Sequence, residues 1–315
     1  MNVGICGTGS ALGSRILTNA ELCQTLGVTE DWVVSKTGIH QRRIAAPGET
    51  VATLALQAAQ EALSAANVSP AAIGLTIVCT FTDAYLFPPA AMRLHRDLGL
   101  KGGYAYDLQA NCSGPIMALV AAADRLRAEP ETGYALVVGA EVMSQFIDYH
   151  DSDTATFLSD GAGAVVLGPS DRGLVSSAFF ADTSDYEAVR CIRGEPGSWP
   201  TMEMYGMTTG KQAVKHLPPT IRRALAKAGW TTDDVDLFVF HQANLRLIEF
   251  LMRGMRLPMN KTYTNVADIG NTGAASLLCA LDGAMREGRI KPGAKVVLAG
   301  VGAGFGFGAT CLVMP

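Results

Sequence analysis

Apolar runs recur along the chain, and segments rich in small and apolar residues at helical spacing separate them. The clearest runs are VGICG, LTIVCTF, YALVVGA, AGAVVLG, DLFVFH, KVVLAGV and ATCLVM. Continuous apolar runs, as opposed to alternating ones, are typical of strands that a sheet buries on both faces. Because strands and helices alternate, the pattern predicts an α/β fold with parallel or mixed sheets covered by helices.

The chain also repeats itself. Residues 62–78 (ALSAANVSPAAIGLTIV) are similar to residues 224–240 (ALAKAGWTTDDVDLFVF), which lie 162 positions later. Asn111 begins a small-residue stretch, NCSG, that leads to an apolar strand, and Asn271 begins a similar stretch, NTGA, 160 positions later. Two matches at nearly one spacing favour a duplication over chance. We therefore predict two related α/β halves.

The boundary between these halves is expected near residue 170. The N-terminal half would comprise residues 1–170 and the C-terminal half residues 171–315. Nothing near the boundary has the composition of a flexible linker, so we expect the halves to form one rigid body. Residues 182–220 have the least regular pattern, which predicts a long loop near the entrance to a substrate site.

Composition narrows the function classes. The chain has 315 residues, of which 49% are hydrophobic, a formal net charge of -4 and a pI of about 5.8. An acidic chain without a long run of charges argues against nucleic-acid binding, and no apolar run is long enough to span a membrane. The N-terminus lacks the pattern of a signal peptide. The seven cysteines show no CxxC spacing and indicate a reducing, cytoplasmic location.

Cys112 lies where a strand is expected to give way to a helix, among small residues. The free N–H groups and the positive dipole end of a helix N-terminus stabilise a thiolate, so this position suits a nucleophilic cysteine. The alternative is a buried structural cysteine, which is the more common fate of a free thiol. We expect the other six cysteines to be structural.

Two further polar residues stand where open α/β sheets bind ligands. His241 directly follows the apolar strand DLFVF, and Asn271 lies between a glycine turn and a helix start. The alternatives are a hydrogen-bonded structural histidine and a helix N-cap. The repeat favours function, because Cys112 and Asn271 occupy nearly equivalent helix starts that a twofold arrangement would bring together. We therefore predict one cleft that contains Cys112, His241 and Asn271.

Two glycine-rich segments have both a structural and a functional explanation. Residues 300–308 lie between two apolar strands, where a hairpin turn would need glycine. The functional explanation is an oxyanion hole formed by the backbone N–H groups of Cys112 and Ala303. Near the N-terminus, GICGTG is similar to part of a dinucleotide-binding loop, but no placed acidic residue follows in a βαβ unit, which argues against a nicotinamide cofactor.

Several segments together resemble the β-ketoacyl-ACP synthase III enzymes of the thiolase superfamily, over essentially the whole chain. They are DWVVSKTGIHQRRIA (31–45), NCSG (111–114), SDGAGAVVLG (159–168), HQANLRLI (241–248), GNTGAAS (270–276) and REGRIKPGAKVVLAGVGAGFGFGA (286–309). One such segment alone would be weak evidence, whereas their combination in this order is specific to the family.

The resemblance implies a thiolase-like fold of two duplicated halves in a five-layered α-β-α-β-α arrangement, and a homodimer. It implies that Cys112 accepts an acyl group, with His241 and Asn271 as its catalytic partners. Coenzyme A thioesters would be substrates, and no permanently bound cofactor or metal is implied.

The resemblance also assigns residues to substrate delivery. Phe87 would lie near the dimer interface and the acyl pocket. The positions implied to bind substrate are Trp32, Lys36, Phe87, Met207, Asn244 and Arg246. The positions implied to present a basic face to acyl carrier protein are Lys211, Arg246 and Arg253.

Six positions depart from the family pattern. Lys36 and Asp151 stand where arginine is common, and Met207 and Gly210 where asparagine and phenylalanine are. Beside the nucleophile, the departures are Asn111 in place of a small residue and Pro115 in place of an aromatic one. All of these positions belong to delivery or pocket shape, which indicates an acyl donor other than the usual acetyl-CoA and a specialised biosynthetic pathway.

The expected reaction has two steps. The Cys112 thiolate attacks an acyl thioester carried by coenzyme A or a carrier protein, and an acyl-cysteine forms. Malonyl-ACP then loses carbon dioxide to give an enolate, which His241 and Asn271 stabilise and which attacks the acyl-cysteine. The alternatives are acyl transfer to an oxygen, nitrogen or carbon nucleophile without malonyl loss, a non-catalytic partner subunit, and a thiolase- or HMG-CoA-synthase-like reaction.

Overall fold

The structure is a computed structural model that describes residues 1–192 and 200–315. Its first sheet contains five strands from the N-terminal part of the chain. They are β1 (Asn2–Leu12), β4 (Ile73–Cys79), β5 (Tyr104–Asp107), β6 (Tyr134–Val142) and β7 (Asp160–Ser170). Their spatial order is β1-β7-β6-β4-β5. β7 pairs antiparallel with both β1 and β6, whereas β6, β4 and β5 run parallel to one another.

The second sheet repeats this topology with strands from the C-terminal part. They are β8 (Leu174–Ala181), β11 (Leu237–Phe240), β12 (Thr262–Tyr263), β13 (Lys295–Gly302) and β14 (Gly306–Val313). Their order is β12-β11-β13-β14-β8, with β12, β11 and β13 parallel and the last two pairings antiparallel. In both sheets the first strand of the half lies at the antiparallel edge, beside the last. The predicted fold of two duplicated α/β halves is confirmed.

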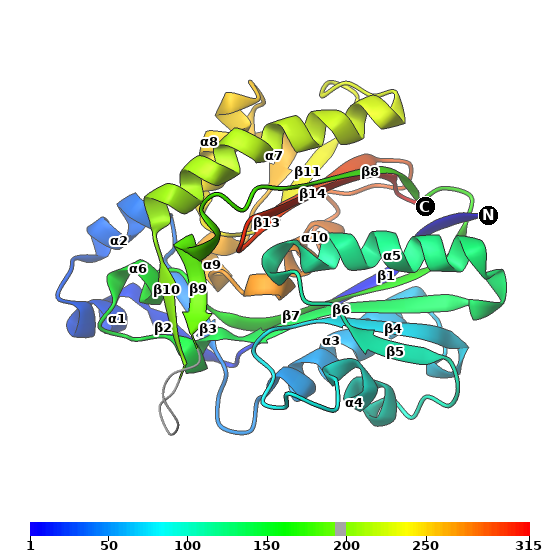
Figure 1. The fold of residues 1–315 in the computed structure, drawn as a ribbon, viewed down its shortest axis with the longest axis horizontal. Helices are drawn as coiled ribbons and strands as arrows, with labels where there is room; N and C mark the ends of the chain where they lie inside the picture. The colour runs from blue at the N-terminus through cyan, green and yellow to red at the C-terminus, as the bar shows by residue number, and fades with distance from the viewer. Residues whose placement is uncertain (193–199) are drawn as a thin grey trace.

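The helices form three layers around the two sheets (Figure 1). Those on the outer face of the first sheet are α3 (Val51–Ala66) and α4 (Ala90–Asp97). Those between the sheets are α5 (Gly114–Ala128) and α10 (Ser276–Arg286). α7 (Gly206–Ala228) covers the outer face of the second sheet, and α8 (Leu245–Gly254) packs beside α7. The order is therefore α-β-α-β-α, as expected.

The remaining elements gather at one end of the molecule, where Figure 1 shows them on the left. The helices are α1 (Asn19–Leu26), α2 (Glu30–Thr37), α6 (Ser152–Ala155) and α9 (Val266–Ile269). Two antiparallel hairpins pair β2 (Arg15–Thr18) with β3 (Gln41–Ile44), and β9 (Val189–Ile192) with β10 (Thr201–Met204). Within the described ranges, no helix is both long enough and apolar enough to cross a bilayer.

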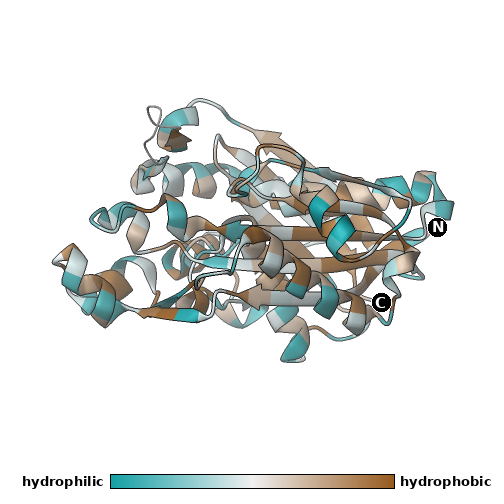
Figure 2. Ribbon diagram, turned by 90° about the horizontal axis from the view of Figure 1, so that it is seen from below, coloured by the Kyte–Doolittle hydropathy of each residue, from teal (hydrophilic) through white to brown (hydrophobic). Residues whose placement is uncertain are grey.

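Burial explains the composition of each layer. Every residue of β11 is buried, and all but the first of β6 are, which accounts for their continuous apolar runs. Figure 2 shows the hydrophobic residues concentrated along the central strands. α10 lies between two sheets and buries eight of its eleven residues, including Ser276 and Asp282. A helix in that layer has almost no solvent face, so small and apolar residues fill it.

Glycines let the middle layer approach the first sheet closely. A Cβ atom placed on Gly139 of β6 would lie 2.5 Å from the carbonyl oxygen of Ala274, and one on Gly163 of β7 would lie 2.6 Å from the Cβ atom of Leu278. Real side chains do not tolerate such distances. The start of α10 and the short helix η7 (Gly273–Ala275) before it therefore rest directly on the strand backbones.

The prediction of a long loop at residues 182–220 is wrong for most of that range. β9, β10 and the first fifteen residues of α7 lie within that range, whereas residues 193–199 are outside the described residues. The pair Pro218-Pro219 lies inside α7. Proline lacks an N–H and normally breaks a helix. Here the buried face that includes Leu217 and Ile221 packs on the second sheet and outweighs that local cost.

Replacing Gly139 with alanine is expected to destabilise the protein, because β6 and η7 must then separate. Overpacking of this kind typically costs about 1–3 kcal/mol. Gly210 in α7 is the matched control, since a Cβ atom there meets nothing within 4 Å, and alanine should stabilise the helix by about 0.4–1 kcal/mol. Urea unfolding measures both variants. A Gly139→Ala protein as stable as the wild type would show that this contact does not limit the packing.

Candidate active site

Cys112 lies in the short helix η2 (Asn111–Ser113), which joins directly to the N-terminus of α5. The residue is partly exposed, whereas the adjacent Ser113 is fully buried. η2 contacts η7 of the other half and the end of β13. The two helix starts that the repeat predicted to be equivalent therefore lie side by side in the middle layer.

His241 and the backbone of Cys112 both lie next to Gly300 of β13. Its backbone N–H donates to the carbonyl oxygen of Ala299 on β13 (2.8 Å). A Cβ atom on Gly300 would lie 3.1 Å from the Cβ atom of His241 and 3.7 Å from the carbonyl oxygen of Cys112. The bare backbone at Gly300 thus allows the nucleophile segment and the histidine to flank the same strand residue.

The hydroxyl of Ser276 determines which nitrogen of the His241 ring carries the proton. The Ser276 Oγ atom accepts a hydrogen bond from the backbone N–H of Gln242 (3.1 Å) and lies 2.6 Å from Nδ1 of His241. Among the described residues the serine proton has no other acceptor, so we assign it to Nδ1, which then accepts. Burial lowers the pKa of His241 to about 4, so the ring is neutral at pH 7. A neutral ring that accepts at Nδ1 carries its hydrogen on Nε2.

Asn271 is held by its backbone and oriented by its side chain. Its N–H donates to the carbonyl oxygen of Phe157, and its carbonyl accepts from Ser159, each at 2.8 Å. The side-chain Oδ1 atom accepts from the N–H of Gly273 (3.0 Å). The Nδ2 group is therefore the end of the amide left to donate, just as Nε2 is in His241.

Glu141, at the end of β6, is a site residue that the sequence reasoning missed. It is fully buried, and its Oε2 atom accepts from the hydroxyls of Thr80 and Thr82 and from the N–H of Phe81. Its Oε1 atom has no partner among the described residues. A Cβ atom on Gly273 would lie 3.0 Å from Cγ of Glu141, so the carboxyl lies directly under η7. In the sequence, only the presence of a glutamate inside the apolar run YALVVGAEV indicates a buried functional carboxyl.

The two acidic groups of the site influence each other. Burial raises the pKa of Glu141 to about 8, so this carboxyl keeps its proton at pH 7. Burial also raises the pKa of the Cys112 thiol, to about 12, and the charge on Glu141 adds to that rise. The free cysteine is therefore a thiol at neutral pH, and the helix N-terminus must stabilise the thiolate as it forms.

The glycine-rich segment forms the hairpin that the structural explanation predicted. Gly302 pairs with Gly306 across the end of β13 and β14, and Ala303 lies in the turn between them. A Cβ atom on Gly302 would lie 2.5 Å from the carbonyl oxygen of Ala110, so the turn rests on the nucleophile loop. The oxyanion hole predicted from the N–H groups of Cys112 and Ala303 stays a prediction.

Four of the residues assigned to substrate binding lie on or beside the packed helices α2 and α8. The ammonium group of Lys36 lies 5.9 Å from the centre of the Trp32 ring. Arg246 donates to the carbonyl oxygen of Val34 (3.0 Å) and so ties α8 to α2. Asn244 is the N-cap of α8 and accepts from the N–H of Leu247 (2.8 Å), which gives it a structural role beside any binding role.

The other assigned residues are more dispersed. Met207 and Lys211 lie in the first turns of α7, where the Met207 side chain is 81% exposed. Arg253 is exposed near the end of α8. Phe87 is 83% exposed in the segment between β4 and α4. Asp151, one of the departures from the family pattern, caps α6 by accepting from the N–H of Asp153 and the hydroxyl of Thr154.

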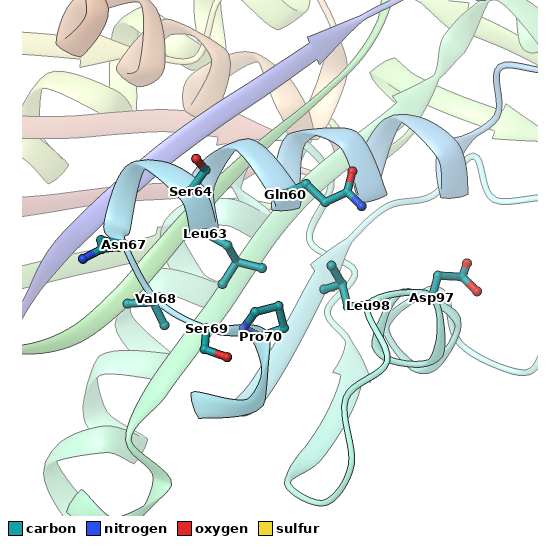
Figure 3. A pocket seen from close by; sticks show the side chains of 9 residues that line it. All are labelled: Gln60, Leu63, Ser64, Asn67, Val68, Ser69, Pro70, Asp97 and Leu98. Atoms are coloured by element: carbon teal, nitrogen blue, oxygen red, sulfur yellow. The ribbon is translucent and has the colours of Figure 1, made fainter.

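A surface hollow elsewhere contains none of these residues. It encloses about 620 Å³ between the C-terminal ends of α3 and α4 (Figure 3). The residues that line it are Gln60, Leu63, Ser64, Asn67, Val68, Ser69, Pro70, Asp97 and Leu98. In the part of the chain that the structure describes, no group of three or more His, Cys, Asp or Glu side chains is placed to hold a metal ion.

Comparison with known proteins identifies relatives along the whole chain. Residues 106–183 match the family model 3-Oxoacyl-[acyl-carrier-protein (ACP)] synthase III, and residues 225–314 match the model of its C-terminal part. The chain is 42% identical over 313 residues to the beta-ketoacyl-[acyl-carrier-protein] synthase III of Laribacter hongkongensis, which covers 98% of both proteins. It is 40% identical over 314 residues to that of Rhizorhabdus wittichii, again with 98% of both covered.

Solved structures agree with these sequence matches. The 3-oxoacyl-[acyl-carrier-protein] synthase III of Aquifex aeolicus superposes with a TM-score of 0.93 at 35% identity, covering 99% of each chain. The priming beta-ketosynthase of the R1128 polyketide biosynthetic pathway superposes with a TM-score of 0.95 at 33% identity, covering 100% of this chain and 96% of the other.

Replacing Glu141 with glutamine should change the reactivity of Cys112 only above about pH 8, where the native carboxyl ionises. Below that pH both side chains are uncharged, and iodoacetamide should alkylate Cys112 at the same rate in both proteins. Above it the carboxylate raises the pKa of the thiol, so the wild type should react several-fold more slowly than the variant.

Peptide-level mass spectrometry separates the alkylation rate of Cys112 from those of the other cysteines. The measurement should run from about pH 6 to 10, because that range spans the raised pKa of a buried carboxyl. Glu131→Gln, at an exposed glutamate in another part of the first half, is the control and should react as the wild type does at every pH. A rate difference already present at pH 6 would contradict the assignment of a protonated Glu141.

Proposed function

Because the chain belongs to the 3-oxoacyl-[acyl-carrier-protein] synthase III family, it is an acyl-transferring condensing enzyme, and we propose that Cys112, His241 and Asn271 carry out its chemistry. The observation that carries this assignment is the orientation of two neutral donors beside the nucleophile. Ser276 directs the hydrogen of the His241 ring to Nε2, and the N–H of Gly273 directs the amide of Asn271 so that Nδ2 donates.

The first half-reaction loads the cysteine. The sulfur of Cys112 attacks the carbonyl carbon of an acyl thioester, the thiol carrier leaves, and the proton of the cysteine goes to the departing thiolate. The negative oxygen of the intermediate needs nearby donors. We propose the backbone N–H groups of Cys112 and Ala303 for this role, since the turn that contains Ala303 rests on the nucleophile loop.

The second half-reaction makes the new carbon–carbon bond. A malonyl thioester loses carbon dioxide, and the electron pair of the broken bond moves to the thioester oxygen as an enolate. His241 Nε2 and Asn271 Nδ2 donate to this oxygen. The enolate carbon then attacks the acyl-cysteine, expels the Cys112 thiolate, and releases a β-ketoacyl thioester, and a proton from solvent restores the Cys112 thiol. Neutral donors suit this step, because a charged histidine would be costly in so buried a position.

The two halves would divide this work. In this proposal residues 1–170 carry the nucleophile and residues 171–315 carry His241 and Asn271. A cytoplasmic location stays a prediction from the cysteine pattern.

Coenzyme A thioesters and acyl carrier protein are the proposed partners. The names of the relatives support the carrier protein. For coenzyme A, the support is the group of Trp32, Lys36 and Arg246 on the adjoining helices α2 and α8. For the carrier protein, the support is the exposure of Lys211 on α7 and of Arg253 on α8, two helices that pack against each other.

We also propose a homodimer formed through the free edge of the first sheet. β5 is the edge strand of that sheet, and its side chains Tyr104 and Tyr106 are 36% and 37% exposed. Nearby, the segment before α4 exposes Leu86 and Phe87 by 74% and 83%. An uncovered edge strand beside large exposed apolar side chains is a liability in a monomer and is typical of an interface. A second copy would bury all of these groups.

A panel of acyl-CoA and acyl-ACP donors tests the proposed function. Intact-protein mass spectrometry should find one acyl group added to the wild type and none added to Cys112→Ala. With malonyl-ACP present, carbon dioxide and a β-ketoacyl product should follow. Asn271→Ala should still be acylated, but its release of carbon dioxide should fall by about 10²- to 10³-fold, as for the loss of one oxyanion donor.

Two outcomes would contradict this function. Product formed without any malonyl thioester would favour simple acyl transfer to another nucleophile. Unchanged release of carbon dioxide by Asn271→Ala, with Cys112 still acylated, would remove Asn271 from the mechanism.

Replacing Ser276 with alanine should slow the decarboxylation and leave the acylation of Cys112 intact. Without the hydroxyl, Nδ1 of His241 loses its donor and the ring no longer prefers to carry its hydrogen on Nε2. We expect release of carbon dioxide to fall by about tenfold or more. The ¹⁵N NMR signals of the histidine ring should report a shift away from the Nε2–H form.

Ser276→Thr is the matched variant, because it keeps the hydroxyl and should restore both the NMR signature and the rate. If the Nε2–H form persists in Ser276→Ala, another group sets the tautomer and the role given to Ser276 is wrong.

A further inference from the structure

Asn111, the residue before the nucleophile, makes a hydrogen bond to the opposite half of the protein. Its Nδ2 group donates to the carbonyl oxygen of Ala303, 192 residues away, at 3.1 Å. Its backbone has a φ of 49°, in the left-handed region that few residues other than glycine adopt. Asparagine tolerates this region better than most residues do. The position therefore combines an unusual backbone with a specific side-chain contact.

The contact joins two loops that glycines already bring together. A Cβ atom on Gly302 would lie 2.5 Å from the carbonyl oxygen of Ala110 and 2.8 Å from Oγ of Ser113. The loop with Cys112 and the hairpin turn with Ala303 thus touch through backbone atoms. Both loops lie wholly within the described residues, and the Asn111 amide makes the one hydrogen bond that connects residues 110–113 to residues 302–306.

We propose that Asn111 is a positioning residue that holds the turn at Ala303 at a fixed distance from the backbone of Cys112. This inference rests on the proposed function, in which the N–H groups of these two residues stabilise the oxyanion. An oxyanion hole works because its donors are already placed where charge will develop. The carbonyl and the N–H of Ala303 belong to consecutive peptide units of one tight turn, so the amide of Asn111 anchors that turn and thereby restrains the Ala303 N–H relative to that of Cys112.

The role predicts which step depends on Asn111. Acylation builds up charge on the thioester oxygen at the two backbone donors, so it should need the contact. Alkylation of the thiol by iodoacetamide develops no oxyanion and should not. Release of carbon dioxide from a malonyl thioester uses the side chains of His241 and Asn271 and should not depend on Asn111 either.

Asn111→Gly is the decisive variant, because glycine keeps the left-handed backbone and removes only the amide. The donor is the acyl-CoA that loads the wild type fastest, chosen from a series of saturated acetyl- to decanoyl-CoA. With this donor, single-turnover acylation of the variant should slow by about two- to tenfold. That is the range expected for one hydrogen bond. The half-saturating acyl-CoA concentration, the iodoacetamide rate and the release of carbon dioxide should stay within error of the wild type.

Asn67→Gly is the matched control. Asn67 also has a left-handed backbone (φ 52°), but it caps the C-terminus of α3 at the surface hollow and touches neither loop. This variant should acylate at the wild-type rate. Asn111→Ala adds a backbone penalty to the loss of the amide, so its thermal stability should fall while its acylation defect should match that of Asn111→Gly.

Two results would overturn the proposal alone. One is wild-type acylation by Asn111→Gly. The other is an equal loss of acylation and alkylation, which would place the effect on the thiol and not on the oxyanion. If no acyl thioester loads the wild-type protein, the proposed function fails, and this inference fails with it.

Discussion

The close packing of the middle helical layer is the constraint on which the site depends. α5 and α10 each begin at the centre of the molecule, and glycines in the flanking strands let their starts approach backbone to backbone. Gly139 admits η7, Gly302 admits the nucleophile loop, and Gly300 admits the side chain of His241. A single Cβ atom at any of these positions would lie within 3.1 Å of a neighbouring atom. Since backbones cannot interpenetrate, the relative position of Cys112 and Asn271 is set by contact.

This packing has an electrostatic consequence. His241 and Glu141 are buried and Cys112 is only partly exposed, so a charge here is costly and the titratable groups are neutral at pH 7. His241 has a lowered pKa, whereas Glu141 and Cys112 have raised ones, and burial is the largest cause in all three cases. The donors are oriented by neighbours of the same short segment, Gly273 and Ser276, before any substrate arrives. Charge then appears only where the reaction creates it, next to donors that need not reorganise.

The sequence predicted the parts that depend on pattern. Buried strands left continuous apolar runs, and the duplication left two matched segments, so the fold and the neighbourhood of the two helix starts could be inferred. The pattern did not predict strands β5, β8 and β12, because they are partly exposed or as short as two residues. The roles of Ser276 and Glu141 could not be inferred, because each depends on which polar atom of a distant segment lies within hydrogen-bonding distance. A local sequence pattern does not indicate which distant residues will form a hydrogen bond.

The structure also separates the chemistry from substrate recognition. Every residue proposed for bond making lies in the middle layer or at a strand end beside it, where packing leaves little freedom. The departures from the family pattern at Lys36, Asp151 and Met207 lie instead on α2, at the N-cap of α6 and on α7, outside both sheets. These three positions lie away from the packing around Cys112, whereas the departures Asn111 and Pro115 lie beside the nucleophile itself. In the proposed function all of these positions shape the delivery of the acyl group, so a change of acyl donor would require no change in Cys112, His241 or Asn271.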